Sequence, residues 1–111
     1  MPKSAITIDQ TVGDKLPVHP GKILSDELNE IELSANTFAA KIKVPTNRVT
    51  EILAGRRSVT AETALRLARF FGTSAQFWMN LQTNYDLKIV VAASGKRIAR
   101  EVNPRAACMS L

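Results

Sequence analysis

The 111-residue sequence predicts an all-α fold of five helices in one compact domain. Three observations support this prediction. Apolar residues recur at helical spacing along most of the chain, residues that cap or stop helices punctuate that pattern, and strand-like alternation is confined to residues 6–8. With 45% hydrophobic residues, the chain can form one modest core.

The first expected helix begins at His19-Pro20-Gly21. Apolar residues continue it at i, i+4 and i+7, namely Leu24, Leu28 and Ile31. We interpret His19 as a capping residue, because the sequence has no other histidine and its one cysteine lies far away in the tail. Ser34 is the expected N-cap of the second helix.

The second and third helices are expected to meet at a tight turn. In the second, Phe38, Ala39 and Ile42 fall on one face, and Lys43-Val44-Pro45 then breaks it. Pro45 suits the first position of a new helix. From Thr46, an apolar stripe follows until Gly55 stops the third helix, and the stripe consists of Val49, Ile52 and Leu53.

The face of the third helix opposite this stripe is short and polar, and it includes Asn47, Glu51 and Ala54. A helix that is held by its neighbour and presents such a face is what the second helix of a helix-turn-helix needs to enter a major groove. DNA binding is therefore the leading interpretation.

The fourth and fifth helices complete the expected core. Thr60 should cap the fourth helix, whose broad apolar stripe ends at Gly72. Ser74 should cap the fifth, which carries the largest apolar side chains and is expected to cover the first helix. Trp78 could serve as a ligand platform, but its place in an aromatic stripe favours a core role.

The two ends of the chain are expected to differ from the domain at residues 18–87. Residues 1–17 are interpreted as a mobile arm, and residues 88–111 as a basic extension with a frayed tail. Residues 87–102 have helical character that Ser94-Gly95 should break and Pro104 should end. The extension and the fifth helix are both candidates for dimerisation.

Charge supports a polyanionic partner. The formal net charge is +5, but residues 1–30 are net acidic. Residues 41–57 contain five basic side chains and one acidic side chain, Glu51, and residues 88–105 repeat that excess. Positive charge concentrated on the expected helix-turn-helix is typical of nucleic-acid binding, whereas the second basic run could equally be a solvated face.

Asn47 is the best candidate for reading a base, because a carboxamide can both donate to and accept from adenine; the alternative is a local capping role. Thr46 can reach a phosphate or a thymine methyl group, and Thr50 flanks the same face. Arg48 could anchor a phosphate or contact guanine, with phosphate favoured. Glu51 could accept from cytosine, but pairing with Arg48 is slightly favoured.

Arg56 and Arg57 follow the helix stop at Gly55, where they could contact the DNA backbone or simply be solvated. No arrangement of residues indicates a catalytic, metal or cofactor site. No apolar run is long enough for a membrane span, and the single cysteine fits a reducing compartment, so we expect a cytoplasmic protein that is not an enzyme.

Two segments, HPGKIL at 19–24 and VPTNRVTEILAGRRSVTAETALRLARFFGTSAQFWMNLQTNYDL at 44–87, together with the basic tail resemble the HigA-type antitoxins of the Xre/Cro helix-turn-helix family. The resemblance covers about residues 18–103. It implies a lambda-repressor-like domain with a short C-terminal helical extension. It also implies a homodimer that binds double-stranded DNA at a near-palindromic operator, represses its operon and neutralises a HigB-like ribonuclease toxin.

The sequence departs from the usual helix-turn-helix pattern at two positions. Lys43 stands where glycine is usual because that residue often adopts a left-handed conformation, and a non-glycine residue there costs on the order of 1 kcal/mol. Pro45 replaces the usual Ser or Thr cap of the third helix and leaves the hydroxyl of Thr46 in its first turn.

A toxin that acts on RNA is expected to be basic, and the basic segment at residues 41–57 would repel it. We therefore expect the toxin to bind the acidic first helix, through Asp26, Glu27 and Glu30, and the arm before it, although these carboxylates could simply be solvated. Two alternative functions stay open. The chain could be a repressor without a toxin, or a toxin inhibitor that has lost DNA affinity.

Overall fold

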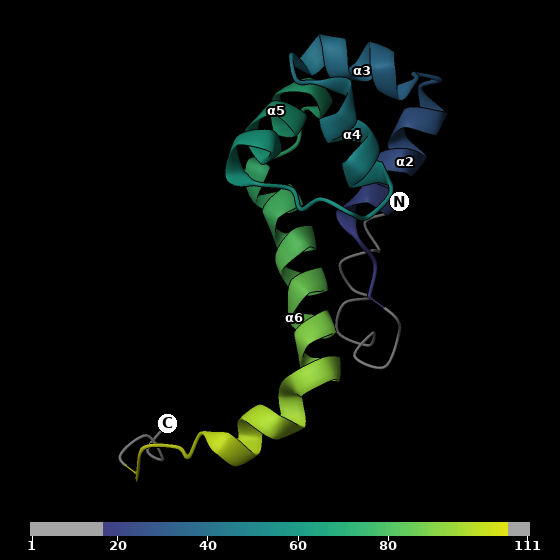
Figure 1. Cartoon of the computed structure of the whole chain (residues 1–111). Coiled ribbons are helices and arrows are strands. Elements are labelled where there is room, and N and C mark those ends of the chain that lie inside the picture. Colours follow the sequence, from purple (N-terminus) through teal and green to yellow (C-terminus); the bar gives the residue numbers. More distant parts are fainter. Residues whose placement is uncertain (1–16, 107–111) are drawn as a thin grey trace.

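A computed structural model describes residues 17–106, which form five helices and no strand (Figure 1). In chain order the helices are α2 (Pro20–Glu30), α3 (Ala35–Ile42), α4 (Thr46–Leu53), α5 (Ala61–Phe71) and α6 (Ala75–Glu101). The prediction of an all-α fold is confirmed for this part of the chain. The alternation at residues 6–8, the N-terminal arm up to residue 16 and the last five residues lie outside the described residues.

Side-chain caps begin four of the helices, as the sequence predicts. In each case the capping side chain accepts a hydrogen bond from a backbone N–H in the first turn, which satisfies a donor that the helix itself leaves free. The four pairs are His19 Nδ1 with Gly21 N at 2.9 Å, Ser34 Oγ with Thr37 N at 3.1 Å, Thr60 Oγ1 with Thr63 N at 3.4 Å, and Ser74 Oγ with Phe77 N at 3.0 Å.

All five helices contribute buried residues to the core, α6 through its first half. Phe38 and Trp78 are its largest buried side chains, with 0% and 1% of their surfaces exposed. Phe71 lies between them, with ring centroids 5.7 Å from Phe38 and 5.8 Å from Trp78. The indole N–H of Trp78 donates to Thr73 Oγ1 at 2.9 Å. The prediction that Trp78 is a core residue is confirmed.

Gly21 allows α2 to pack directly against the end of α4. A Cβ atom added at Gly21 would overlap the backbone carbonyl oxygen of Ile52. Only glycine leaves room for two backbones at this separation. The position of α4 is therefore fixed partly by a contact between its backbone and that of α2.

Helix α6 is continuous over 27 residues, from Ala75 to Glu101. The predicted break at Ser94-Gly95 is therefore wrong, and the expected boundary between residues 87 and 88 falls inside one helix. Each of these residues costs a helix only about 0.5–1 kcal/mol, and neither removes a backbone donor as proline does. The axis of α6 bends in its last turns, which project away from the body (Figure 1).

Candidate nucleic-acid interface

Helix α4 is held by its apolar side and exposes a polar one. Val49 and Ile52 are 1% and 2% exposed, and Leu53 is half-buried. Of the three residues predicted on the opposite face, Asn47 and Ala54 are exposed and Glu51 is half-buried. Thr46 and Thr50 are exposed as well. Helices α3 and α4 are arranged as a helix-turn-helix (Figure 1). In such a motif the second helix presents its polar face to the major groove of DNA.

The turn between α3 and α4 contains the predicted left-handed residue. Lys43 has φ 63° and ψ 47°, and its N–H and that of Val44 donate to carbonyl groups of the last turn of α3. Arg66 of α5 adds a third donor, from Nη1 to the carbonyl oxygen of Ile42 at 2.9 Å. This contact satisfies a free carbonyl at the helix end, and nothing in the sequence indicated it.

The start of α4 confirms that Pro45 replaces the usual Ser or Thr cap. Pro45 is the N-cap, with φ −63° and ψ 146°, rather than the first helical residue, and it makes no side-chain capping bond. Proline fits both positions because its fixed φ is compatible with an extended cap as well as with a helix. The hydroxyl of Thr46 donates instead to Asn36 Oδ1 at 2.9 Å and links the first turns of α3 and α4. Asn36 is exposed at this junction, and the sequence pattern gave no sign of its role.

The side chain of Asn47 makes no hydrogen bond within residues 17–106, so its donors and acceptor face solvent. The hydroxyl of Thr50, in contrast, donates to the Asn47 carbonyl oxygen at 3.2 Å. A side chain that is exposed and unpaired can bond to a base edge without breaking an existing contact.

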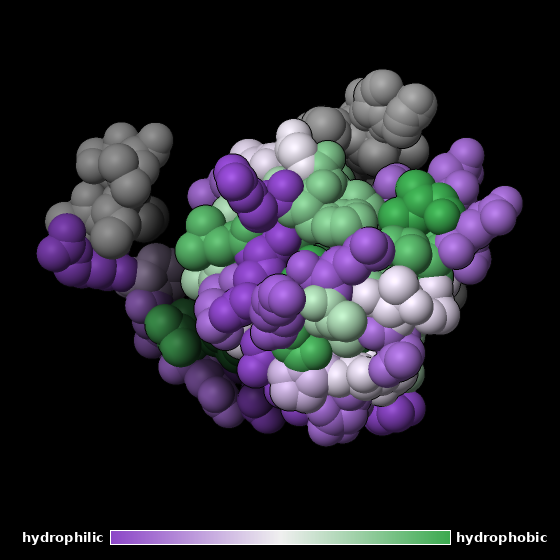
Figure 2. Space-filling model, turned by 90° about the horizontal axis from the view of Figure 1, so that it is seen from above, coloured by the Kyte–Doolittle hydropathy of each residue, from purple (hydrophilic) through white to green (hydrophobic). Residues whose placement is uncertain are grey.

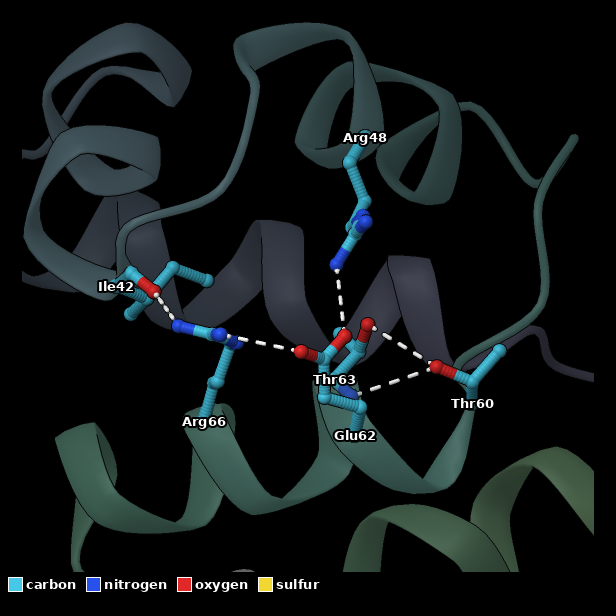
Figure 3. Close-up of polar contacts among 6 residues, drawn as sticks. All are labelled: Ile42, Arg48, Thr60, Glu62, Thr63 and Arg66. Atoms are coloured by element: carbon cyan, nitrogen blue, oxygen red, sulfur yellow. Dashed lines mark hydrogen bonds and ion pairs between the residues drawn. The ribbon is translucent and has the colours of Figure 1, made fainter.

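Two ion pairs on α4 differ from the prediction. Glu51 pairs with Arg57 at 2.7 Å rather than with Arg48, and Arg48 pairs with Glu62 of α5 at 3.3 Å. The preferred Glu51–Arg48 pair is therefore wrong, because residues brought close by the fold compete with residues close in sequence. Arg66 also binds Glu62, at 3.1 Å (Figure 3). Its hydrogen bond and charge, with those of Arg48, lower the pKa of the Glu62 carboxyl.

The segment after α4 carries two arginines, of which Arg57 is paired with Glu51 and Arg56 is not paired within residues 17–106. Gly55 ends the helix with φ 77°, and the N–H of Arg56 donates to the Glu51 carbonyl oxygen at 2.8 Å. The Arg56 side chain is exposed and has no partner among residues 17–106. Arg57 is held by Glu51 through Nε at 2.8 Å. Both arginines therefore lie at the exposed C-terminal end of α4.

Further basic residues border this region. A shallow groove of about 660 Å³ lies between α3 and α5, and its charged lining includes Lys41, Lys43, Arg66 and Arg69 against Glu62. Hydrophilic side chains surround separate hydrophobic patches on the face seen from above (Figure 2). The basic excess read from residues 41–57 therefore extends onto α5.

The acidic residues expected to contact a toxin lie on α2. Asp26, Glu27 and Glu30 are all exposed, and Asp26 pairs with Lys22 at 3.2 Å. In the described part of the chain, no group of three or more potential ligands could hold a metal ion. Among those same residues, no helix is both long and apolar enough to cross a membrane.

Comparison with known proteins places this geometry in a family. A helix-turn-helix family model matches residues 24–78. Virulence-associated protein I of Dichelobacter nodosus is 49% identical over 73 residues, which are 65% of this chain and 68% of that protein. A HigA-family addiction module antidote protein from Coxiella burnetii is 56% identical, with a TM-score of 0.78, over 80% of this chain and 98% of that one. The chain belongs to the HigA family of antitoxins.

Another HigA structure, the Pseudomonas aeruginosa antitoxin solved with the higBA promoter, is 47% identical, with a TM-score of 0.77. It covers 79% of this chain and 97% of its own. The segment matched by the helix-turn-helix model begins in α2 and ends in the first half of α6. The second half of α6 therefore lies beyond the helix-turn-helix unit of this HigA-family chain.

Proposed function

We propose that this chain is a DNA-binding antitoxin that represses its own operon and neutralises a HigB-like ribonuclease toxin. The observation that carries the proposal is the exposed polar face of α4, held by buried Val49 and Ile52 and bordered by basic residues. The Pseudomonas aeruginosa relative was solved with the higBA promoter, which supports DNA binding by this chain. In this proposal the protein acts by binding rather than by catalysis, and it acts in the cytoplasm.

Base reading is assigned to Asn47, with Thr46 and Thr50 beside it on the same face. Asn47→Ala should cost about 1–3 kcal/mol at the operator and leave binding to random duplexes nearly unchanged. Operator and random-sequence duplexes of equal length, titrated side by side, measure this difference. Equal losses on both would remove Asn47 from the reading role.

Backbone anchoring is assigned to Arg56, with Arg57 and Arg48 as further candidates. Arg56→Ala should weaken binding to all sequences and lower the dependence of log K on log salt concentration by about 0.9 for each phosphate that the protein no longer neutralises. The matched comparison is Arg100→Ala, which removes the same charge from the last turns of α6. An unchanged slope for Arg56→Ala would make Arg56 a solvated residue.

The second half of α6 is the proposed dimer contact. Three exposed apolar residues, namely Leu87, Val91 and Ile98, follow one side of the helix at spacings of four and seven residues, and exposed Val102 is the C-cap that follows it. A two-fold dimer would bury this stripe and place two α4 helices on half-sites about 34–36 Å apart or a multiple of that distance. A protein that is monomeric at micromolar concentration and on DNA would contradict the proposal.

Toxin binding is assigned to the exposed acidic side of α2. Replacing Asp26, Glu27 and Glu30 by neutral residues should weaken toxin binding and leave operator affinity equal or higher, because the net charge becomes more positive. Co-purification with the product of the adjacent gene separates an antitoxin from a repressor that has no toxin. Salt-dependent operator binding separates both from an inhibitor that does not bind DNA.

A further inference from the structure

The connection between α4 and α5, residues 54–60, is exposed and yet firmly anchored. Residues 54–58 are all exposed, whereas Val59 is only 2% exposed. The backbone N–H of Val59 donates to Oε1 of Gln82, in α6, at 2.7 Å. This hydrogen bond is buried and joins residues 23 positions apart. A buried N–H that loses its acceptor carries the full cost of its desolvation.

The orientation of Gln82 is fixed by a second contact. Its Nε2 donates to Asp86 Oδ1, one turn further along α6, at 2.9 Å. A carboxylate can only accept, so the amide must turn its NH₂ group toward Asp86 and its oxygen toward Val59. Gln82 is only 5% exposed and is one of two polar residues buried within the described chain. An apolar residue of similar length could fill the space but could not hold the connection.

The same connection is anchored at two other points. A Cβ atom at Gly55 would lie 3.8 Å from Cγ of His19, so the imidazole ring lies against the backbone there. The His19 ring in turn contacts Tyr85 of α6 edge-on, with centroids 4.8 Å apart. Glu51 of α4 holds the side chain of Arg57. The two arginines proposed to contact phosphates are thus carried by a segment whose shape is set by α2, α4 and α6.

We propose that Gln82 is a positioning residue for DNA binding, which holds the connection so that Arg56 and Arg57 face the phosphate backbone. This inference rests on the proposed DNA-binding function. Gln82 lies in α6 and touches no nucleic acid; it acts through Val59. Contacts of the helix-turn-helix with the DNA phosphates therefore depend on α6, whose second half is the proposed dimer contact.

The test uses the full chain and a random-sequence duplex long enough for two half-sites, because phosphate contacts do not depend on sequence. Gln82→Met keeps length and net charge but removes the acceptor. The double variant Gln82→Glu with Asp86→Asn also keeps net charge: residue 82 still accepts from the Val59 N–H, and the bond to residue 86 is restored with donor and acceptor exchanged. Thr73→Val is the matched control, since it removes a side-chain acceptor from the buried Trp78 N–H at the opposite end of α5.

Gln82→Met should bind about tenfold more weakly and lower the salt slope by about 1–2, which corresponds to one or two phosphate contacts. The double variant should return to within about twofold of the natural chain, and Thr73→Val should keep the natural slope even where it melts earlier. Hydrogen exchange at the Val59 amide should speed up in Gln82→Met and recover in the double variant.

Two results would overturn the inference. In one, Gln82→Met has the salt slope of Thr73→Val. In the other, the double variant protects the Val59 amide but binds as weakly as Gln82→Met. Failure of the proposed function is distinguishable, because the natural chain would then show no salt-dependent binding to any duplex, before any variant is made.

Discussion

The two halves of α6 follow the same helical spacing in opposite surroundings. In the first half, Trp78 and Gln82 are 1% and 5% exposed. In the second half, Leu87 and Val91 are 59% and 64% exposed. Periodicity predicts that a helix has an apolar side, but what lies beside the helix decides whether that side is covered. The first half is stabilised from within the domain, whereas the second half leaves its apolar side exposed.

The strongest test of this contrast is Trp78→Ala. Removing a buried indole from the core should lower the free energy of unfolding by about 3–5 kcal/mol, which threatens the fold of so small a domain. Urea unfolding followed by circular dichroism measures the loss. A variant that unfolds like the natural chain but loses a partner would make Trp78 an interface residue.

A change in the second half should affect association and spare the fold. Val91→Glu places a charge in the proposed dimer contact and should weaken the dimer by about 2–3 kcal/mol, with helicity unchanged. Sedimentation equilibrium measures the association. Lys96→Gln, on the opposite side of the helix, alters net charge by the same amount and should leave the dimer intact. Equal effects of the two variants would mean that charge, not the apolar stripe, controls association.

The pH dependence of stability tests the contact between α2 and the first half of α6, where His19 packs against Tyr85. Burial lowers the pKa of His19 below its usual 6.5, although Asp86 and a hydrogen bond with the Arg57 backbone act in the opposite direction. The unfolded chain therefore takes up the proton more readily, and stability is lost as pH falls below about 6.5, by at most about 1.4 kcal/mol per pH unit.

His19→Asn keeps a capping side chain and removes this titration. Unfolding free energies at pH 7.5 and 5.5 should differ less in this variant than in the natural chain. An identical pH dependence in both proteins would assign the acid sensitivity to carboxylates such as Glu62.

The smallest expected effect is that of Gly95→Ala, which separates helix propensity from side-chain packing in the second half of α6. Gly95→Ala in the second half should stabilise the helix by about 0.5–1 kcal/mol, since the added Cβ would meet Val91 Cγ1 at 3.4 Å, an ordinary contact. Unfolding at a concentration where the protein is monomeric checks this. A destabilised variant would mean that the second half is already packed against something in the monomer.

Local rules account for what the sequence predicted correctly. Ser34, Thr60 and Ser74 cap helices that begin next to them, and Lys43 adopts the left-handed conformation expected of the turn. The contacts that sequence reasoning missed join distant residues. Asn36 with Thr46 and Gln82 with Val59 depend on how whole helices are placed, which no spacing along the chain specifies.

The error at Ser94-Gly95 has a different origin. Two weak helix formers in succession suggest a stop, but their summed cost is smaller than the cooperative gain of a helix already formed on both sides. Gly55 and Gly72 differ from Gly95 in backbone conformation: both adopt positive φ angles and end their helices, whereas Gly95 does not. Composition alone does not separate these two uses of glycine.

The contact between Gly21 and the Ile52 carbonyl sets a rule for redesigning this protein. The exposed positions of α4 can be randomised to seek new operator preferences, since their side chains contribute little to the core. Residue 21 has to stay glycine in such libraries, because any side chain there would push the end of α4 outward and tilt the whole reading surface. Its tolerance to mutation is thus the reverse of what its small size suggests.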